Sequence, residues 1–305
     1  MKTPRSTFRD AIRREDFVLT AELPLGSGTV GEDVRAAVAV LREAFDAVQV
    51  ADNPAGHPHI SPIAAASLVL DEGMDPIVHL GCRDRNRIAL QSDLMGAAAI
   101  GVTSLVLTRG EKMPPALKAK VKGVFDIGAQ RLVATAQALA ANERLVPPPG
   151  FFIGSNVTAL DPPPDWTADG VDGKADAGIK FVQTQACLDV DVLRRYMAAL
   201  VARKLIERLS VIVQVPLVDS MEMVHDLRQA RRPLLVSDAC AQRLREAVDV
   251  AAEGEALCRE VLLEVATVPG VSGVNILYRG APEAAVRLAS WFRAETRQAH
   301  ASPGA

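Results

Sequence analysis

The sequence predicts a single α/β domain folded as a (β/α)8 TIM barrel, and three observations support this fold class. Eight short apolar segments alternate with longer amphipathic segments along the 305 residues. Most of the short segments are apolar throughout, as expected for parallel strands that are covered on both faces. A repeated strand and helix predicts right-handed crossovers, and eight such units close into a barrel of about 250 residues.

The expected strands are short, and each ends close to a polar or charged residue. They cover residues 17–23, 47–52, 75–82, 104–110, 151–157, 181–187, 210–218 and 273–278. An open doubly wound sheet is the alternative fold, and it calls for a glycine-rich dinucleotide turn after an early strand. The segment LPLGSG, which follows the first expected strand, does not match that GxGxxG pattern.

Two of the expected helices carry clear end signals. Residues 85–101 form a helical pattern that ends in Gly101, a residue type that commonly follows a helix C-terminus. Residues 189–209 place their apolar side chains on one stripe, and either Asp189 or Asp191 can cap the N-terminus. Both patterns predict helices that pack on the outside of the barrel.

The C-terminal third contains more helix than the barrel repeat requires. Residues 237–268 are expected to form one or two additional helices before the last strand, beginning from a cap at Ser237 or Asp238. The whole chain, 1–305, is therefore expected to be a single barrel domain. Residues 1–15 and 297–305 are expected to be terminal extensions.

The composition argues against several classes of function. Lys and Arg number 34 against 37 Asp and Glu, so there is no basic excess for nucleic-acid binding. No apolar run approaches the roughly 18 residues of a membrane span, and the charged N-terminal segment lacks the apolar core of a signal peptide. The four cysteines form no CxxC pair, which favours a cytoplasmic protein with reduced thiols.

Polar residues gather where the expected strands end, and in a barrel these ends meet at one mouth. The glutamines in the strand expected at 181–187 are costly unless they form hydrogen bonds. An amide both donates and accepts, which suits a pteridine, a flavin or another amide. The candidates at the mouth are Glu22, Asp52, Asn53, His79, Arg83–Asn86, Arg109–Glu111, Ser155, Asn156, Gln183, Gln185, Gln214, Asn275 and Tyr278.

Some of these candidates also have a structural interpretation. Glu22 can form an ion pair with Arg109 at the barrel rim, and His79 can be a hydrogen-bonded histidine of the core. The segment RDRN at 83–86 can serve only to begin the following helix. Spacing alone does not decide between these interpretations.

A metal site is not predicted. His57 and His59 lie close together in the sequence HPH and resemble a pair of metal ligands only weakly. No third ligand accompanies them in the sequence, whereas a catalytic zinc site has three protein ligands.

Long segments of the sequence resemble the methylenetetrahydrofolate reductase family. One segment spans residues 50–102, contains HLGCRDRN and DLMGAAAIG, and is followed by LVLTRGE at 105–111. Another is KADAGIKFVQTQACLD at 174–189. The resemblance runs from the first to the sixth expected strand, about two thirds of the chain, and the last two strands fit by pattern only.

The resemblance implies an oxidoreductase of one-carbon metabolism and methionine biosynthesis. It implies hydride transfer from NADH or NADPH, through non-covalently bound FAD, to 5,10-methylenetetrahydrofolate, giving 5-methyltetrahydrofolate. The expected partners are therefore a tetrahydrofolate derivative and a nicotinamide nucleotide. Either a homo-oligomer or a redox partner protein is compatible with the sequence.

The resemblance also implies roles for individual residues. Glu22 is implied to be the general acid, and Glu111 stands where the family usually has a catalytic aspartate. Gln183, Gln185 and Leu227 are implied to contact the folate, with Leu227 replacing an aromatic residue. The implied cofactor contacts are Asp52, His79, Arg109, Gly110, Asn156 and Lys174.

The sequence departs from the family pattern around the fifth strand. Residues 151–166 lack the Tyr-Pro and the histidine that pack on the flavin, and Thr167 replaces an aspartate that contacts the ribose. A flavin-independent reductase, with direct transfer from nicotinamide to folate, is therefore one alternative. The same chemistry run oxidatively in methyl-group catabolism and a non-catalytic folate-binding paralogue are the others.

Overall fold

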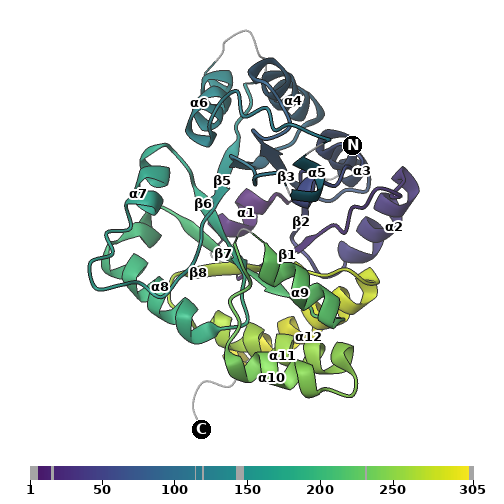
Figure 1. The fold of residues 1–305 in the computed structure, drawn as a ribbon, viewed down its shortest axis with the longest axis vertical. Helices are drawn as coiled ribbons and strands as arrows, with labels where there is room; N and C mark the ends of the chain where they lie inside the picture. Colours follow the sequence, from purple (N-terminus) through teal and green to yellow (C-terminus); the bar gives the residue numbers. More distant parts are fainter. Residues whose placement is uncertain are drawn as a thin grey trace.

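Eight parallel strands form the centre of this computed structural model (Figure 1). They pair in sequence order, and β1 also pairs with β8, so the barrel is closed. The predicted (β/α)8 barrel is therefore confirmed, and the open-sheet alternative is wrong. The strands are β1 (Val18–Glu22), β2 (Ala47–Val50), β3 (Pro76–Gly81), β4 (Ser104–Thr108), β5 (Phe152–Asn156), β6 (Phe181–Ala186), β7 (Ser210–Pro216) and β8 (Val271–Leu277).

Helices surround the barrel in the parts of the chain that the structure describes, which are residues 6–14, 17–113, 115–118, 120–141, 148–230 and 232–301. Most of them pack their apolar faces against the outward side chains of the strands in one continuous core. The helices are α1 (Phe8–Arg13), α2 (Gly31–Leu41), α3 (Pro62–Asp71), α4 (Arg87–Ile100), α5 (Pro115–Lys118), α6 (Ala129–Ala140), α7 (Asp169–Asp176), α8 (Val190–Ala202), α9 (Met221–Gln229), α10 (Asp238–Glu246), α11 (Val250–Ala266) and α12 (Pro282–Ala301).

The helix ends follow the signals in the sequence. Asn86 begins α4, because its Oδ1 accepts a hydrogen bond from the backbone N of Ala89 at 2.9 Å. Gly101 ends the same helix in the left-handed conformation, with φ of 87°. Asp189 caps α8, since its Oδ1 accepts from the backbone N of Val192 at 3.1 Å.

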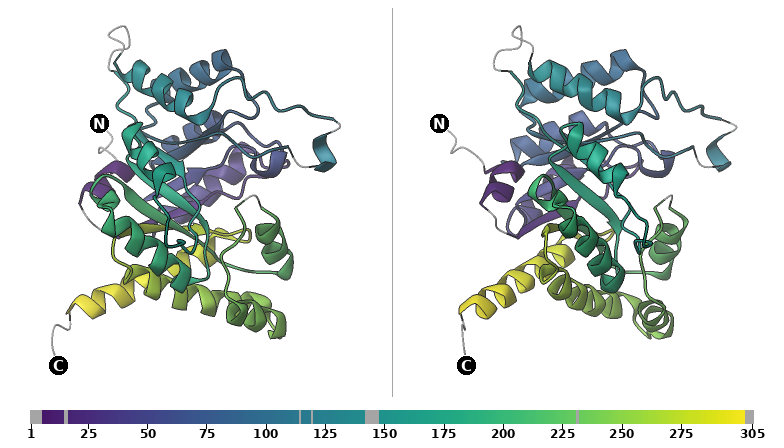
Figure 2. Two further views of the ribbon diagram at one scale, coloured as in Figure 1. Left: turned by 60° about the vertical axis from the view of Figure 1, so that its left-hand side comes forward. Right: turned by 90° about the vertical axis from the view of Figure 1, so that its left-hand side faces the viewer.

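The additional helices before the last strand are present. Residues 237–268 contain both α10 and α11, and the Ser237 hydroxyl accepts from the backbone N of Cys240 to cap the first of them. Together with α9, these helices lie between β7 and β8 in the chain. Figure 2 shows α10, α11 and α12 gathered along one side of the barrel.

The short helix α1 closes the N-terminal end of the barrel. Phe8 is fully buried, and its backbone N donates to Asp75 Oδ2 at 2.9 Å. Its ring lies 5.9 Å from the ring of Phe152 and 5.0 Å from that of Phe181, both in edge-on arrangements. In Figure 1, α1 lies behind the centre of the ring of strands. A ligand of the barrel interior must therefore enter from the opposite end, where the strands terminate.

Both predicted terminal extensions overlap helices. The N-terminal one, 1–15, contains α1, while residues 1–5 and 15 lie outside the described part of the chain. The C-terminal one, 297–305, contains the end of α12, and residues 302–305 lie outside the described part.

The described helices include none whose length and apolar character would let it cross a membrane. The four cysteines carry free thiols. Burial raises the pKa of Cys82 to about 11 and that of Cys187 to about 12. These two thiols are therefore protonated near neutral pH and are poor nucleophiles.

Candidate active site

The barrel interior changes from apolar to polar along the strands. Alternate residues of each strand point inward. At the closed end, the inward residues that cluster with Phe8 are Val18, Ala47, Ile77, Val106, Phe181 and Ile212. Nearer the open end, the inward residues include Thr20, Gln49, His79, Gln183, Gln214 and Asn275. We call these six residues the polar layer, and it lies where such barrels usually pack branched apolar side chains.

Glu22 ends β1 and faces the polar layer. Its Oε2 accepts a hydrogen bond from Nε2 of Gln214 in β7, at 3.0 Å. Burial raises the pKa of Glu22 to about 7, although the amides of Gln214 and Asn275 act in the opposite direction. Near neutral pH this carboxyl exists both as the acid and as the carboxylate, which suits a general acid.

The alternative ion pair between Glu22 and Arg109 is not formed among the described residues. Arg109 is exposed, and its guanidinium lies 5.0 Å from the centroid of the Phe125 ring. The backbone N of Phe125 donates to Cys82 O at 3.1 Å, which fixes that ring beside the end of β3. Arg109 therefore belongs to the rim of the mouth.

His79 is an uncharged and hydrogen-bonded member of the polar layer. Its Nε2 lies 3.0 Å from Oε1 of the fully buried Gln49, whose Nε2 donates to Oε1 of Gln183. Burial lowers the pKa of His79 to about 4, so the ring is neutral at physiological pH. Because Gln49 Oε1 can only accept, Nε2 of His79 carries the proton and Nδ1 is an acceptor.

Hydrogen bonds continue from Gln49 towards Glu22. The Gln49 Nε2 lies 3.5 Å from the Thr20 hydroxyl, which donates to Asn275 Oδ1 at 3.0 Å. The buried Nδ2 of Asn275 has no hydrogen-bond partner among the described residues, yet its amide lowers the pKa of Glu22. The hydrogen bonds of the polar layer thus run from the histidine of β3 to Asn275 in β8, the strand that pairs with β1.

Asn156 and Lys174 present polar groups that a ligand can satisfy. The buried Oδ1 of Asn156, at the end of β5, has no hydrogen-bond partner among the described residues. The Lys174 Nζ is 3.5 Å from the Gly170 carbonyl oxygen. Burial and the nearby charge of Arg232 lower the pKa of Lys174. Two neighbouring cations attract an anionic group such as a phosphate.

Gln185 is engaged with the loop after β5. Its Oε1 accepts from the backbone N of Ala159 at 2.9 Å, and its Nε2 donates to the Ala159 carbonyl at 2.8 Å. The pairing of β6 with β7 is irregular between Gln183 and Ala186, where Gln185 lies. The side chain therefore binds both the N–H and the carbonyl of one residue, through its acceptor and its donor.

Asp52 belongs to an ion-pair network that braces the rim. The two terminal nitrogens of Arg85 donate to its two oxygens at 2.7 and 2.9 Å, and the backbone N of Gly81 donates to Oδ2 at 2.7 Å. Arg85 Nε also lies 2.7 Å from Asp93. Both carboxylate oxygens of Asp52 are occupied, and its role as a cofactor contact stays a prediction.

The turn after β4 requires a glycine. Gly110 has φ of 81°, and a Cβ at this position would lie 2.9 Å from Cβ of Arg83. The buried Arg83 pairs with Asp84 at 2.6 Å and donates to the carbonyl of Asn53 at 2.7 Å. The charge of Glu111 also acts on Arg83 and helps to raise the pKa of the guanidinium. The Glu111 carboxylate therefore lies near the rim network.

The family relationship is decided by a match over most of the chain. The family model described as methylenetetrahydrofolate reductase matches residues 7–268. The chain belongs to the methylenetetrahydrofolate reductase family. A comparison with curated proteins finds no significant match.

Solved structures share the barrel of this methylenetetrahydrofolate reductase family member at low sequence identity. An uncharacterized protein from Clostridium thermocellum that binds two copies of 5-methyl-5,6,7,8-tetrahydrofolic acid has a TM-score of 0.67 and 15% identity, covering 92% of this chain and 96% of that chain. DmoA from Hyphomicrobium sulfonivorans has a TM-score of 0.56 and 11% identity, covering 93% and 88%. The EDTA monooxygenase EmoA from Chelativorans sp. BNC1 has a TM-score of 0.53 and 12% identity, covering 92% and 94%.

Among the predicted residues, Leu227, Tyr278 and Ser155 do not face the barrel interior. Leu227 in α9 packs against the main hydrophobic core, and its contact with substrate stays a prediction. Tyr278 is buried in the same core, so its expected place in the polar ring at the mouth is wrong. Tyr278 and Asn275 are three positions apart and therefore point to opposite faces of the sheet. Ser155 also faces away, and its hydroxyl donates to the Leu107 carbonyl at 3.0 Å.

His59 of the HPH segment has a local role. The backbone N of Asn53 donates to His59 Nε2 at 3.1 Å, and His59 Nδ1 lies 2.6 Å from the carbonyl of Ile60. Across the described ranges, no group of three His, Cys, Asp or Glu side chains is arranged to hold a metal ion.

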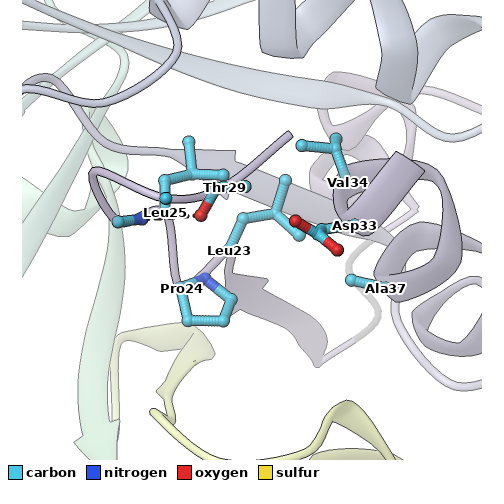
Figure 3. Close-up of a pocket in the computed structure, with 9 residues that line it drawn as sticks. Leu23, Pro24, Leu25, Thr29, Asp33, Val34 and Ala37 are labelled. Carbon is cyan, nitrogen blue, oxygen red and sulfur yellow. Dashed lines mark hydrogen bonds between the residues drawn. The ribbon is translucent and has the colours of Figure 1, made fainter. Parts of the chain in front are cut away.

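A cavity of about 360 Å³ lies between the β1–α2 loop and helix α2, apart from the polar layer. Figure 3 shows Leu23, Leu25, Val34 and Asp33 around it. Asp33 Oδ2 accepts a hydrogen bond from the backbone N of Val30 at 2.9 Å, so its carboxylate caps the helix. Leu23 follows Glu22 directly but points to the opposite side of the chain.

Three residues belong to the site although no role was assigned to them from the sequence. Gln214 and Asn275 were recognisable as polar residues within apolar strands, but their contact with Glu22 joins distant parts of the chain. Arg232 lies in the segment RQARR, and no sequence pattern marks it as a neighbour of Lys174.

The raised pKa of Glu22 predicts a pH-dependent loss of stability. The folded protein holds this proton up to about pH 7, whereas the unfolded chain releases it near 4.5, so stability falls as pH rises through this window. Glu22→Gln should therefore stabilise the protein at about pH 8 relative to about pH 5, by up to about 3 kcal/mol. Urea unfolding at both pH values measures this difference. Glu43→Gln, at an exposed position, is the control, and an equal effect of Glu22→Gln at both pH values would contradict the assignment.

Proposed function

We propose that this protein interconverts 5,10-methylenetetrahydrofolate and 5-methyltetrahydrofolate, using NADH or NADPH as the hydride donor in the reductive direction. The observation that carries the proposal is a carboxyl with a pKa of about 7, facing a polar layer at the only end of the described barrel that α1 does not close. Membership of the methylenetetrahydrofolate reductase family supports the reaction. The folate bound by the Clostridium thermocellum protein supports the substrate class.

Glu22 supplies the proton that this reaction requires. The bridging methylene carbon of the substrate is bonded to two nitrogens, and protonation of one nitrogen lets its bond to that carbon break. The other nitrogen then forms an iminium with the carbon, which accepts a hydride to become the methyl group. Glu22 is partly protonated near pH 7 and can act as this general acid. Gln214 stabilises the carboxylate that remains, through its Nε2–H.

The residues at the mouth fit a flavin as the cofactor. The unpartnered Oδ1 of Asn156 can accept from a ring N–H, and the neutral His79 adds no charge beside the ring. Lys174 and Arg232 can hold an anionic phosphate group. A bound flavin would relay the hydride from the nicotinamide to the folate.

Gln185 is the best-placed residue for selecting the pterin. Its amide accepts from the N–H of Ala159 and donates to the carbonyl of the same residue, and the lactam of a pterin also presents one N–H donor and one carbonyl acceptor. Folate can therefore replace the peptide at this amide if the loop after β5 moves. This exchange would couple binding of folate to the position of the loop.

The activity is tested by incubating the purified protein with NADH or NADPH and 5,10-methylenetetrahydrofolate, without oxygen. We expect 5-methyltetrahydrofolate to form, as measured by chromatography and mass spectrometry. The reverse reaction, with 5-methyltetrahydrofolate and an electron acceptor, shows whether the same site also works oxidatively. Saturable folate binding without conversion in either direction would instead support a non-catalytic folate-binding protein.

Gln185→Ala should weaken folate binding much more than nicotinamide binding. The loss should be about tenfold to 100-fold, because a buried partner loses its hydrogen bonds. The free energy of unfolding should also fall by about 2 kcal/mol, since the Ala159 peptide loses both hydrogen bonds. Calorimetric titration with each ligand measures the binding. Equal losses for both ligands would show that Gln185 only supports the barrel wall.

A further inference from the structure

The contact between Gln214 and Glu22 joins two strands that are not neighbours in the sheet. Gln214 lies in β7 and Glu22 in β1, with β8 between them, and 192 positions separate the two residues in the chain. The backbone of Gln214 has separate partners, because its N donates to the Thr184 hydroxyl at 3.2 Å and its carbonyl accepts from Cys187 N at 2.9 Å. The amide side chain is therefore not required for the backbone hydrogen bonds of β7.

The direction of this hydrogen bond decides which carboxyl oxygen carries the proton. The amide Nε2 of Gln214 can only donate, so Oε2 of Glu22 must accept. In a protonated carboxyl, the carbonyl oxygen is the stronger acceptor and the hydroxyl oxygen holds the proton. Oε2 is thus the carbonyl oxygen of the acid form, and Oε1 carries the proton.

We propose that Gln214 is a positioning residue that fixes the Glu22 carboxyl so that the transferable proton lies on Oε1. This inference rests on the proposed role of Glu22 as the general acid and adds a residue that the family resemblance does not supply. Gln214 itself transfers no proton, and it acts on the reaction only through Glu22. The proton moves from Oε1 to the leaving nitrogen of the folate, and the negative charge left on the carboxylate is shared with the Nε2–H of Gln214.

Within the described ranges of the chain, no charged side chain competes with Gln214 for the orientation of Glu22. The elements around Glu22 contribute Gln49 and Asp52 from the β2 segment, His79 from β3, Gln214 from β7 and Asn275 from β8. His79 is neutral, and Asp52 is paired with Arg85. Burial and the amides of Gln214 and Asn275 are the influences that shift the pKa of Glu22.

Replacing Gln214 with methionine removes the donor and keeps a side chain of similar length. Gln214→Met should lower the rate of folate reduction about tenfold, with little change in the KM for folate. The midpoint of the Glu22 titration should move to higher pH, because the contact that favours the carboxylate is lost. Gln214→Glu, which places a second acid beside Glu22, should move the midpoint in the same direction and provides a second variant of the same size.

A double-mutant cycle separates positioning from a general structural effect. In a Glu22→Gln background, Gln214→Met should cause no further loss of folate reduction, because the residue acts through Glu22. An equal loss in both backgrounds would overturn the proposal. The unfolding temperature of each variant provides a readout that is independent of activity.

Infrared spectroscopy separates failure of this inference from failure of the proposed function. The carbonyl stretch of protonated Glu22, isolated by subtracting the spectrum of Glu22→Gln, can be titrated without any substrate. A shift of its midpoint to higher pH in Gln214→Met and Gln214→Glu supports the contact even if the wild-type protein reduces no folate. An unchanged midpoint in both variants, with normal folate reduction in wild type, would overturn the positioning role and leave the proposed function intact.

Discussion

Glu22→Gln should slow reduction of methylenetetrahydrofolate by about 100-fold or more, the scale expected when a general acid is lost. Reduction of the bound cofactor by NADH or NADPH should stay nearly unchanged, because that step needs no proton from this side chain. Stopped-flow measurement of each half-reaction separates the two effects. Glu43→Gln serves as the matched exposed control and should leave both rates unchanged. A normal rate of folate reduction in Glu22→Gln would exclude the assignment of Glu22.

Adding FAD to flavin-depleted protein should restore folate reduction in parallel with saturable flavin binding. Near β5 the sequence lacks two groups of residues that contact the flavin cofactor in the family, and the loss of each should weaken FAD binding about tenfold. We therefore expect FAD binding to be weak but specific. Fluorescence quenching of FAD measures binding, and the NADH-dependent assay measures activity on the same samples.

A matched pair of lysine variants tests the cofactor contact. Lys174→Gln should weaken FAD binding about tenfold, whereas Lys180→Gln, at an exposed position, should not. Full activity in flavin-depleted protein, unchanged by added FAD, would contradict the flavin route. It would show direct transfer from the nicotinamide to the folate instead.

Most of the fold was predictable because it depends on local signals. All eight strands lie where short apolar runs predict them, and Gly101, Asp189 and Ser237 mark helix ends as expected. The role of α1 was not predictable, because its segment is short and charged. Phe8 reaches the barrel only through contacts with Phe152 and Phe181, which are distant in the chain.

The site was predictable as a set of strand ends, but its hydrogen bonds were not. Strand-end position and side-chain type suggested Glu22 and His79, and the structure places His79 within the polar layer and Glu22 next to it. The pairing of Gln185 with the Ala159 peptide depends on how the loop after β5 folds back. Tyr278 points away from the barrel interior because successive side chains of a strand alternate between its two faces. Selecting residues only because they are polar and end a strand does not take this alternation into account.

The most direct test of the account is the pH dependence of kcat/KM for methylenetetrahydrofolate, which reports ionisations of the free enzyme and free substrate. If Glu22 is the acid, kcat/KM should be constant below about pH 7 and should fall tenfold for each pH unit above it, as the carboxyl loses its proton. The residual activity of Glu22→Gln should lack this decline. A wild-type profile without a decline on the alkaline side, or the same decline in Glu22→Gln, would contradict the central claim that Glu22 donates the proton.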